Sequence, residues 1–361
     1  MLESLVAENF VVIDWSIALQ VIVLGFIGGT LSGFIGSGGA FFMTPGMMNA
    51  GVPGAVAVAS NITHKFGKAM VGAKRHGEMG HVDKRLALVM LVTSAAAISL
   101  AAWLMQQMGA KGKGSSGNAG ADLYISTVFV VVLSFVAVSM LKDIVGSRGR
   151  QDTQPSRRIV EFLGRLPLPP YIHFRVADVR VSLWVVLVCG LATGFLAGTI
   201  GVGGFIGVPA MIYVFGVPAQ VAAGTELFLA QFMGAWGALN YGFRGMVDIR
   251  LVLLLYGGSL IGIHFGAYGT KVVRELFIRL VTSCIILLCV LSRAIAVPVY
   301  LRRLGWLDYD PGLDAYFNGA SKVLLYASGI VGTALILVFV FRGYLQRRRI
   351  AASLQVSGSK A

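Results

Sequence analysis

Four polar side chains lie well inside two long apolar stretches of this sequence, where they could bind an ion. Asn61, Lys65 and Lys68 belong to the first stretch and Glu226 to the second. The first three follow one another at spacings of four and three, so in a helix they share one face. If these stretches cross a membrane, each charge costs about 2.5–3.5 kcal/mol on insertion scales, and such groups usually face the protein interior and mark ion pathways. The cationic face favours an anion as the ligand.

Neighbouring residues extend this candidate site. His64 precedes Lys68 by four positions and is a candidate proton carrier. Thr225 lies beside Glu226 and is a candidate hydroxyl donor to the ligand. Glu226 could pair with Lys65 or Lys68, or carry a coupling proton. The structural alternatives are an ion pair that only stabilises the fold, and a Lys68 that extends along the helix toward the lipid headgroups.

A glycine-rich unit occurs twice in the chain, at a constant offset of 165 positions. The paired segments are Gly36-Ser37-Gly38-Gly39 with Gly201-Val202-Gly203-Gly204, Gly51-Val52-Pro53 with Gly216-Val217-Pro218, and Val82-Asp83-Lys84-Arg85-Leu86 with Val247-Asp248-Ile249-Arg250-Leu251. At the same offset, Asn61 is matched by Glu226. A glycine-broken apolar unit present in two copies is typical of transporters built from repeats.

Glycine runs inside an apolar stretch allow a helix to stop within the membrane. The helix that restarts there presents free N–H groups and the positive end of its dipole, which suit an anion. The candidate ligand amides are those of Gly36, Gly38, Gly39, Gly201, Gly203 and Gly204. The alternative role for these glycines is close packing between helices.

Composition identifies the class of protein. The 361 residues are 56% hydrophobic and 13% charged, with a mean hydropathy of +0.79, whereas soluble chains are about 25% charged. The net charge of +14 comes mostly from Lys and Arg between apolar runs and in the tail. There they act as topology signals and as contacts to membrane lipids, so nucleic acid is not an expected partner. No spacing indicates a metal site, a cofactor or enzyme catalysis.

The apolar pattern predicts the elements that position these residues. Spans are expected at 15–35, 54–74, 86–108, 123–142, 181–200, 218–241, 251–270, 276–298 and 321–342. Two apolar pieces, 40–50 and 205–215, are too short to cross a bilayer. They indicate broken or re-entrant helices, whose backbone must be satisfied by protein or by a water-filled cavity. The expected fold is an all-α polytopic membrane protein with two homologous helical repeats, Gly-broken or re-entrant helices, and about 8–9 transmembrane helices.

Polar segments divide the chain. The expected parts are a first transmembrane repeat (1–146), a basic cytoplasmic linker (147–180), a second transmembrane repeat (181–300), and a loop, extra transmembrane helix and basic tail (301–361). Within the linker, residues 159–166 predict a short amphipathic interfacial helix. Residues 109–121 predict a flexible loop. Asp83 and Asp248 are expected to cap the helices that follow them.

The positive-inside rule gives a first topology. It places Lys84, Arg244, Arg250 and the linker at 147–180 in the cytoplasm if the N-terminus is inside and each unit crosses four times. The two units would then be parallel repeats. This topology conflicts with the rule at the end of the chain, because it leaves the arginines at 347–349 outside. An inverted arrangement remains an alternative if a re-entrant segment crosses fully.

The glycine units also carry a resemblance to a known family. Gly33-Phe34-Ile35-Gly36-Ser37-Gly38-Gly39 with Gly51-Val52-Pro53, and residues 194–205, resemble the sulfite exporter TauE/SafE family of anion permeases. The resemblance covers residues from about 20 to 300. It implies a bacterial or archaeal plasma-membrane carrier that moves sulfite, sulfoacetate or related organosulfonates without ATP. The family's glycine-break positions fall on the six glycines named above, whereas the roles of Lys65, Lys68 and Glu226 depend on the physical argument alone. The linker, the loop at 300–320 and the ninth span depart from the family pattern.

The expected function is therefore secondary transport of a small inorganic or organic sulfur anion across the cell (plasma or inner) membrane. The anion would bind at mid-membrane between the repeats, at the two breaks and at Lys65 and Lys68, and Glu226 or His64 would couple its movement to protons. Two other classes are an anion channel, and a non-transporting membrane scaffold or sensor that uses the linker as a docking surface. The choice of anion, the direction, the coupling ion and the oligomeric state stay open.

Overall fold

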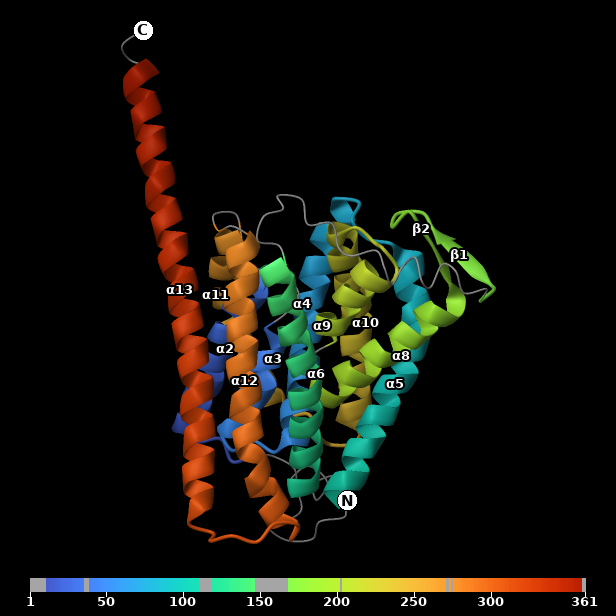
Figure 1. Cartoon of the computed structure of the whole chain (residues 1–361), viewed down its shortest axis with the longest axis vertical. Helices are drawn as coiled ribbons and strands as arrows, with labels where there is room; N and C mark the ends of the chain where they lie inside the picture. Colours follow the sequence, from blue (N-terminus) through green and yellow to red (C-terminus); the bar gives the residue numbers. More distant parts are fainter. Residues whose placement is uncertain are drawn as a thin grey trace.

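The computed structural model of the chain describes residues 11–35, 39–110, 118–146, 168–201, 203–270, 273 and 275–358. The long helices are α2 (Trp15–Ile35), α4 (Gly54–Glu78), α5 (Lys84–Ala110), α6 (Ala119–Gly146), α8 (Leu183–Ile200), α10 (Ala219–Phe243), α11 (Ile249–Thr270), α12 (Glu275–Arg303) and α13 (Leu313–Gly358). The short elements are the helices α3 (Ala40–Asn49) and α9 (Gly204–Pro209), the π-helical turn η1 (Ala210–Val214), and the strands β1 (Tyr171–Phe174) and β2 (Val179–Ser182). Figure 1 shows the long helices as one upright bundle.

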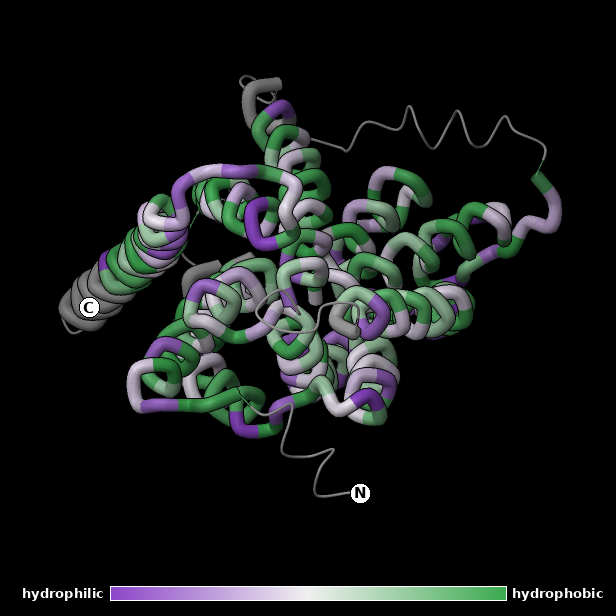
Figure 2. The backbone as a smooth tube through the Cα atoms, turned by 90° about the horizontal axis from the view of Figure 1, so that it is seen from below, coloured by the Kyte–Doolittle hydropathy of each residue, from purple (hydrophilic) through white to green (hydrophobic). Residues whose placement is uncertain are grey.

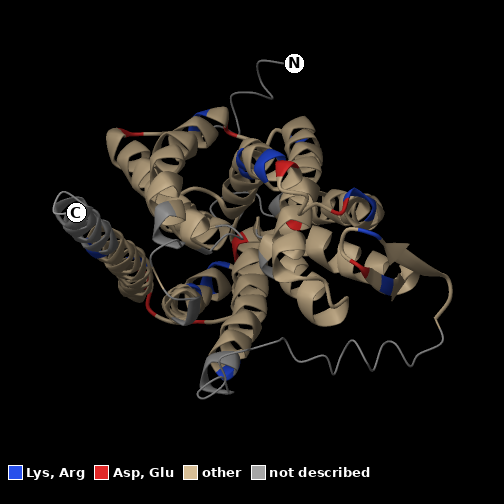
Figure 3. Ribbon diagram, turned by 90° about the horizontal axis from the view of Figure 1, so that it is seen from above, with Lys and Arg blue, Asp and Glu red and all other residues tan. Residues whose placement is uncertain are grey.

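The all-α polytopic fold is confirmed. Within the described residues, seven helices are long and apolar enough to cross a membrane: α2, α5, α6, α8, α11, α12 and α13. The other two long helices, α4 and α10, have 25 residues each and carry the polar groups of the candidate site. Hydrophobic residues predominate in the long helices, as Figure 2 shows. Seen from above, the helices consist mostly of uncharged residues, among which Lys, Arg, Asp and Glu are sparse (Figure 3).

Short helices occupy the two apolar pieces that are too short to span. Residues 40–50 form α3, and residues 205–215 form most of α9 and η1. α3 runs back along α2, because Gly39 lies against Gly28 while Gly46 lies against Leu24. The chain therefore returns toward the end of the molecule at which α2 began, and α4 starts from that end.

A small β-hairpin, which the sequence did not predict, lies where the basic linker meets the second transmembrane part. β1 and β2 are antiparallel, and Tyr171 pairs with Ser182. Asp83 holds the turn between the strands, since its Oδ2 accepts hydrogen bonds from the amides of Val176 (3.0 Å) and Ala177 (3.1 Å). Its Oδ1 accepts one from the amide of Leu86 (3.1 Å), so Asp83 also caps α5 as expected. The interfacial helix predicted at 159–166 lies outside the described residues, as do residues 111–117 of the predicted loop.

Glycines bring α2 and α11 into direct backbone contact. A Cβ atom on Gly258 would lie 2.0 Å from the carbonyl oxygen of Ile22, and one on Gly266 would lie 2.0 Å from that of Thr30. The contacting residue numbers rise together, so the two helices are parallel. α5 and α8 pack in the same way, with Gly194 against Ser94. Small residues are the usual means by which membrane helices approach so closely.

Gly257 and Gly258 form a matched pair that tests this packing. Gly258 is buried against α2. Gly257 is exposed, and a Cβ atom there would meet none of the described residues within 4 Å. Gly258→Val is expected to lower the stability of the protein by at least the 1–3 kcal/mol, roughly, that is typical of overpacking. Gly257→Val should change it little. The measurement is thermal unfolding in detergent; equal effects of the two substitutions would contradict the close α2–α11 contact.

α4 and α10 cross in opposite directions at the centre of the bundle. Gly234 lies against Phe66, and Gly72 lies against Leu227 farther along, so one residue number rises as the other falls. The bounds of α4 and α10 are themselves 165 positions apart. α4 and α10, which follow the two glycine units, therefore run in opposite directions, whereas the first topology has them run in the same direction.

The topology predicted for the loops changes accordingly. Arg250 donates a hydrogen bond to the carbonyl oxygen of Val11 (2.8 Å), which places the start of α11 at the end where α2 begins. Lys84 starts α5 at the opposite end, beside the β-hairpin (Figure 1). Arg244 and Arg250 thus lie at the other end of the bundle from Lys84, contrary to the first topology. The physical reason is the return of α3 along α2, which leaves each unit with an odd number of crossings instead of four.

Candidate functional site

The two helix breaks meet around one buried side chain, Asn61 of α4. Its Nδ2 donates hydrogen bonds to the carbonyl oxygen of Ala40 (2.9 Å) and to Oγ1 of Thr44 (2.8 Å), both on α3. The Thr44 hydroxyl in turn donates to the carbonyl oxygen of Ile200 (3.1 Å), the last residue of α8. Asn61 has no exposed surface, and its Oδ1 has no hydrogen-bond partner among the described residues. The Asn61 amide therefore connects the start of α3, through Thr44, to the end of α8. Its Oδ1 remains available as a hydrogen-bond acceptor.

Glycine is required at Gly201, where α8 stops. Gly201 has a φ of 75° and caps α8 in the left-handed conformation, which residues with a Cβ rarely adopt. A Cβ atom there would lie 2.8 Å from Nδ2 of Asn61. The break thus brings bare backbone against the Asn61 amide.

Beside the second break lies a buried pair of opposite charges. Nζ of Lys65 is 3.8 Å from Oε1 of Glu226, and the two side chains are 12% and 3% exposed. Neither carboxylate oxygen of Glu226 has a hydrogen-bond partner among the described residues. A Cβ atom on Gly203 would lie 3.2 Å from Nζ of Lys65, and one on Gly207 would lie 2.1 Å from Oε2 of Glu226. The Lys65–Glu226 distance is thus long for an ion pair. The two side chains lie against the backbone of the segment that begins at Gly203 and continues as α9.

This arrangement leaves polar groups available in a buried place. A buried carboxylate without hydrogen bonds is costly unless it is protonated or another group binds it. A buried ammonium has three donors, and one partner at 3.8 Å satisfies few of them. The pair can therefore exchange its mutual attraction for a bound anion at Lys65 and a proton at Glu226.

Other predicted site residues face different neighbours. His64 places Nε2 2.7 Å from Oγ of Ser259, and its ring centre is 4.6 Å from that of Tyr256, so it faces α11. The Thr225 hydroxyl accepts a hydrogen bond from the amide of Asp83 (2.9 Å) and joins α10 to the start of α5. Lys68 is half-buried on the turn of α4 that follows Lys65.

The glycines predicted as ligands also differ in their neighbours. Gly39 packs against Gly28 at the start of α3, and Gly204 opens α9. Gly201 and Gly203 lie beside Asn61 and Lys65 respectively. Gly36 and Gly38 lie outside the described residues. The structure thus brings together Asn61, Lys65 and Glu226 with the second break, and it places His64 and Thr225 against other helices.

A buried arginine on α12 is a further polar group that was not among the residues predicted from the sequence. Arg293 is 1% exposed, and it donates hydrogen bonds to Oδ1 of Asn49, to Oγ of Ser321 (3.1 Å) and to the hydroxyl of Tyr300 (3.5 Å). The signal was available, because Arg293 falls inside the predicted span 276–298 and an intramembrane charge indicates function there as much as at Lys65.

Comparison with known proteins gives one family. The family model described as "Sulfite exporter TauE/SafE" matches residues 21–293. The "Probable membrane transporter protein YjnA" of Bacillus subtilis (strain 168) is 24% identical over 253 residues, which cover 70% of this chain and 89% of that protein. The "Probable membrane transporter protein YunE" of the same organism is 21% identical over 277 residues, which cover 74% of this chain and 94% of that protein. No solved structure matches the chain significantly.

Proposed function

Since the chain belongs to the sulfite exporter TauE/SafE family of membrane transporters, we propose that it is a secondary transporter of small sulfur-containing anions such as sulfite or organosulfonates. The family match and the apolar helices make it a multi-pass protein of the cell membrane. Transport driven by gradients needs no covalent chemistry, so the residues need only bind, orient and exchange charge.

The observation that carries the proposal is the buried Lys65–Glu226 pair beside a helix break. We place the anion at the ammonium of Lys65, with the amides around Gly203 and Gly204 as further donors and Lys68 as a second positive charge one turn away. Asn61 fixes the ends of the two broken helices and so holds these amides in place. Binding sites near the midplane, at discontinuous helices, are common in transporters with inverted repeats.

Charge balance at the pair suggests how transport is coupled. When Glu226 is ionised it competes with the substrate for Lys65, and when it is protonated it releases Lys65 to the anion. Proton uptake by Glu226 then accompanies anion binding, and the two would cross together. His64 remains the alternative carrier, although it acts from the α11 side through Ser259.

Alternating access follows from the inverted arrangement of the two halves. The opposite directions of α4 and α10, and their offset of 165 positions, support two inverted repeats that exchange roles as the site opens to either side. The β-hairpin, which carries Arg180, and the start of α5 at Lys84 belong to one end of the bundle (Figure 1), which the positive-inside rule assigns to the cytoplasm. The start of α2 at Trp15 then lies outside, opposite to the side that the first topology gives it.

The carrier is preferred to the two other classes. Asn61 and Glu226 are almost completely buried, which fits a closed centre better than an open channel. A scaffold or sensor would not need an unsatisfied charge pair at this depth.

Flux through proteoliposomes tests the proposal. Uptake of sulfite, sulfate, thiosulfate and a small sulfonate would be measured with and without a pH gradient. At least one of these anions is expected to show saturable uptake, stimulated several-fold when the gradient drives protons in the same direction. Non-saturating, ohmic currents would instead support a channel, and the absence of flux for every anion would support the scaffold.

A further inference from the structure

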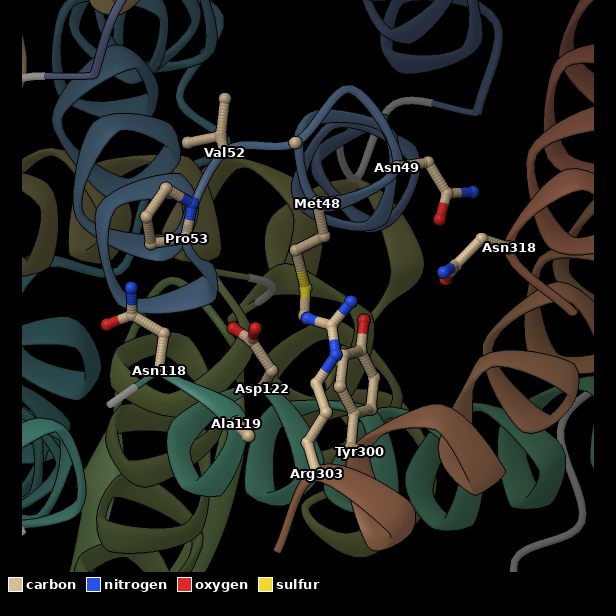
Figure 4. A pocket seen from close by; sticks show the side chains of 11 residues that line it. Met48, Asn49, Val52, Pro53, Asn118, Ala119, Asp122, Tyr300, Arg303 and Asn318 are labelled. Atoms are coloured by element: carbon tan, nitrogen blue, oxygen red, sulfur yellow. The ribbon is translucent and has the colours of Figure 1, made fainter. Parts of the chain in front are cut away.

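A polar cavity of about 300 Å³ lies at the end of the bundle opposite the β-hairpin. It is formed where α3 ends, α4 and α6 begin, α12 ends and α13 begins (Figure 4). Its polar lining consists of Asn49, Asn118, Asp122, Tyr300, Arg303 and Asn318. None of these residues belongs to the central site. The volume of the cavity and the hydrogen-bond donors that line it suit a small ligand.

Positive charges outnumber negative charges around the cavity. Oδ1 of Asp122 accepts a hydrogen bond from the amide of Gly54 (2.7 Å), which anchors this carboxylate at the start of α4. Arg303 lines the cavity, and Arg293 lies behind its wall, where it donates to Asn49 and Tyr300. Neither guanidinium has an ion pair within the part of the chain that the structure describes, whereas the adjacent Arg302 is paired with Asp314. Two guanidinium groups against one carboxylate make the region net positive.

The helix α3 connects this cavity to the central site. Its residue Thr44 belongs to the hydrogen-bond network of Asn61, and its residue Asn49 lines the cavity. Five residues of helix span about 7–8 Å along the axis. The cavity therefore lies between the centre of the bundle and the surface at that end, on the side that the proposed topology assigns to the outside.

We propose that this cavity is a second anion site, an outer vestibule that binds the transported oxyanion before or after it occupies the central site. The proposal rests on the proposed transport function. Arg303 is the direct contact, and the amides of Asn118 and Asn318 together with the Tyr300 hydroxyl complete the donors. Arg293 contributes its charge through the wall and positions Asn49 and Tyr300. Asp122 opposes the anion and lets it leave.

The test compares transport from the two faces of the membrane. Arg303→Gln is expected to raise KM about tenfold for anion that enters from the cavity side, in right-side-out vesicles, with little change in the maximal rate. KM should stay unchanged for entry from the other face, in inside-out vesicles. Asp122→Asn should act in the opposite sense and lower KM on the cavity side, because Asn can still accept the hydrogen bond from Gly54.

Arg244→Gln is the matched control, since it removes a positive charge at the same end of the bundle but outside the cavity. A KM that Arg303→Gln leaves unchanged, or raises equally on both faces, would overturn the proposal, as would an equal effect of Arg244→Gln. These outcomes leave wild-type transport intact, so they differ from a failure of the proposed function, in which the wild type moves none of the anions.

A second measurement separates the two sites in the purified protein. Sulfite and sulfate are expected to raise the thermal unfolding temperature of Lys65→Met, which lacks the central cation, and this stabilisation should disappear in Lys65→Met/Arg303→Gln. Stabilisation that persists in the double variant, or that is absent from Lys65→Met while present in the wild type, would exclude the vestibule. Absence of stabilisation from the wild type as well would count against both sites.

Discussion

Lys65→Met is expected to abolish anion flux and to destabilise the protein. The substitution removes the ammonium 3.8 Å from Glu226. It leaves a buried carboxylate that has no hydrogen-bond partner in the described part of the chain. Breaking a buried pair in this way typically costs about 3–5 kcal/mol. Flux would be measured in proteoliposomes, and stability as the thermal unfolding temperature in detergent.

Loss of flux alone would not separate a ligand from a structural residue, so the double variant is the informative one. Lys65→Met/Glu226→Gln removes both charges and should recover most of the lost stability, because no unpaired charge remains. It should not recover transport if Lys65 binds the anion. Recovery of both would mean that the pair only holds the fold together. Lys74→Met, an exposed lysine on the same helix, serves as the control and should retain normal flux.

Gly39→Val should abolish transport even in protein that still inserts into the membrane. A Cβ atom at Gly39 would lie 1.9 Å from the carbonyl oxygen of Gly28, and it would meet backbone, which cannot rotate away. The start of α3 must then move from α2, and it would carry with it the carbonyl of Ala40, which accepts the hydrogen bond of Asn61. We expect flux at background level and a loss of stability of at least the 1–3 kcal/mol, roughly, that is typical of overpacking.

Gly77→Val is the comparison for this prediction. Gly77 is exposed near the end of α4, and among the residues that the structure describes a Cβ atom there would have no neighbour within 4 Å. It should therefore keep normal flux. Normal flux through Gly39→Val would show that the junction of the two breaks does not position the transport site.

Both predictions depend on a site whose charged residues could be identified from the sequence, although their contacts could not. Lys65 and Glu226 could be selected from the sequence because a charge inside an apolar span is costly and usually marks a functional site. This inference needs only the residue and the span around it. Their pairing required α4 and α10 to cross with these two residues at the contact. Thr225 shows the limit of the local argument: it adjoins Glu226 in the chain, yet its hydroxyl contacts Asp83 instead, because successive residues of a helix face different neighbours.

Arg293 and the cavity near it illustrate the same limit from the other side. The cavity is assembled from residues of α3, α6, α12 and α13 and of the connections beside them, which are far apart in the chain. Each residue taken alone is an ordinary polar group near the end of a span. Only their convergence reveals a net positive region.

The sequence by itself determined where the helices lie. The span predicted at 15–35 is the helix Trp15–Ile35, and the pieces too short to cross became α3 and α9 with η1, because apolar length and glycine breaks act on the residues that carry them. The tertiary structure alone decided the directions of the helices. Whether α3 returns along α2 depends on the fit of Gly39 against Gly28, a contact between two helices that no pattern of hydrophobicity records. That return inverts the second half relative to the first, and it brings Asn61 to both breaks and Lys65 to Glu226.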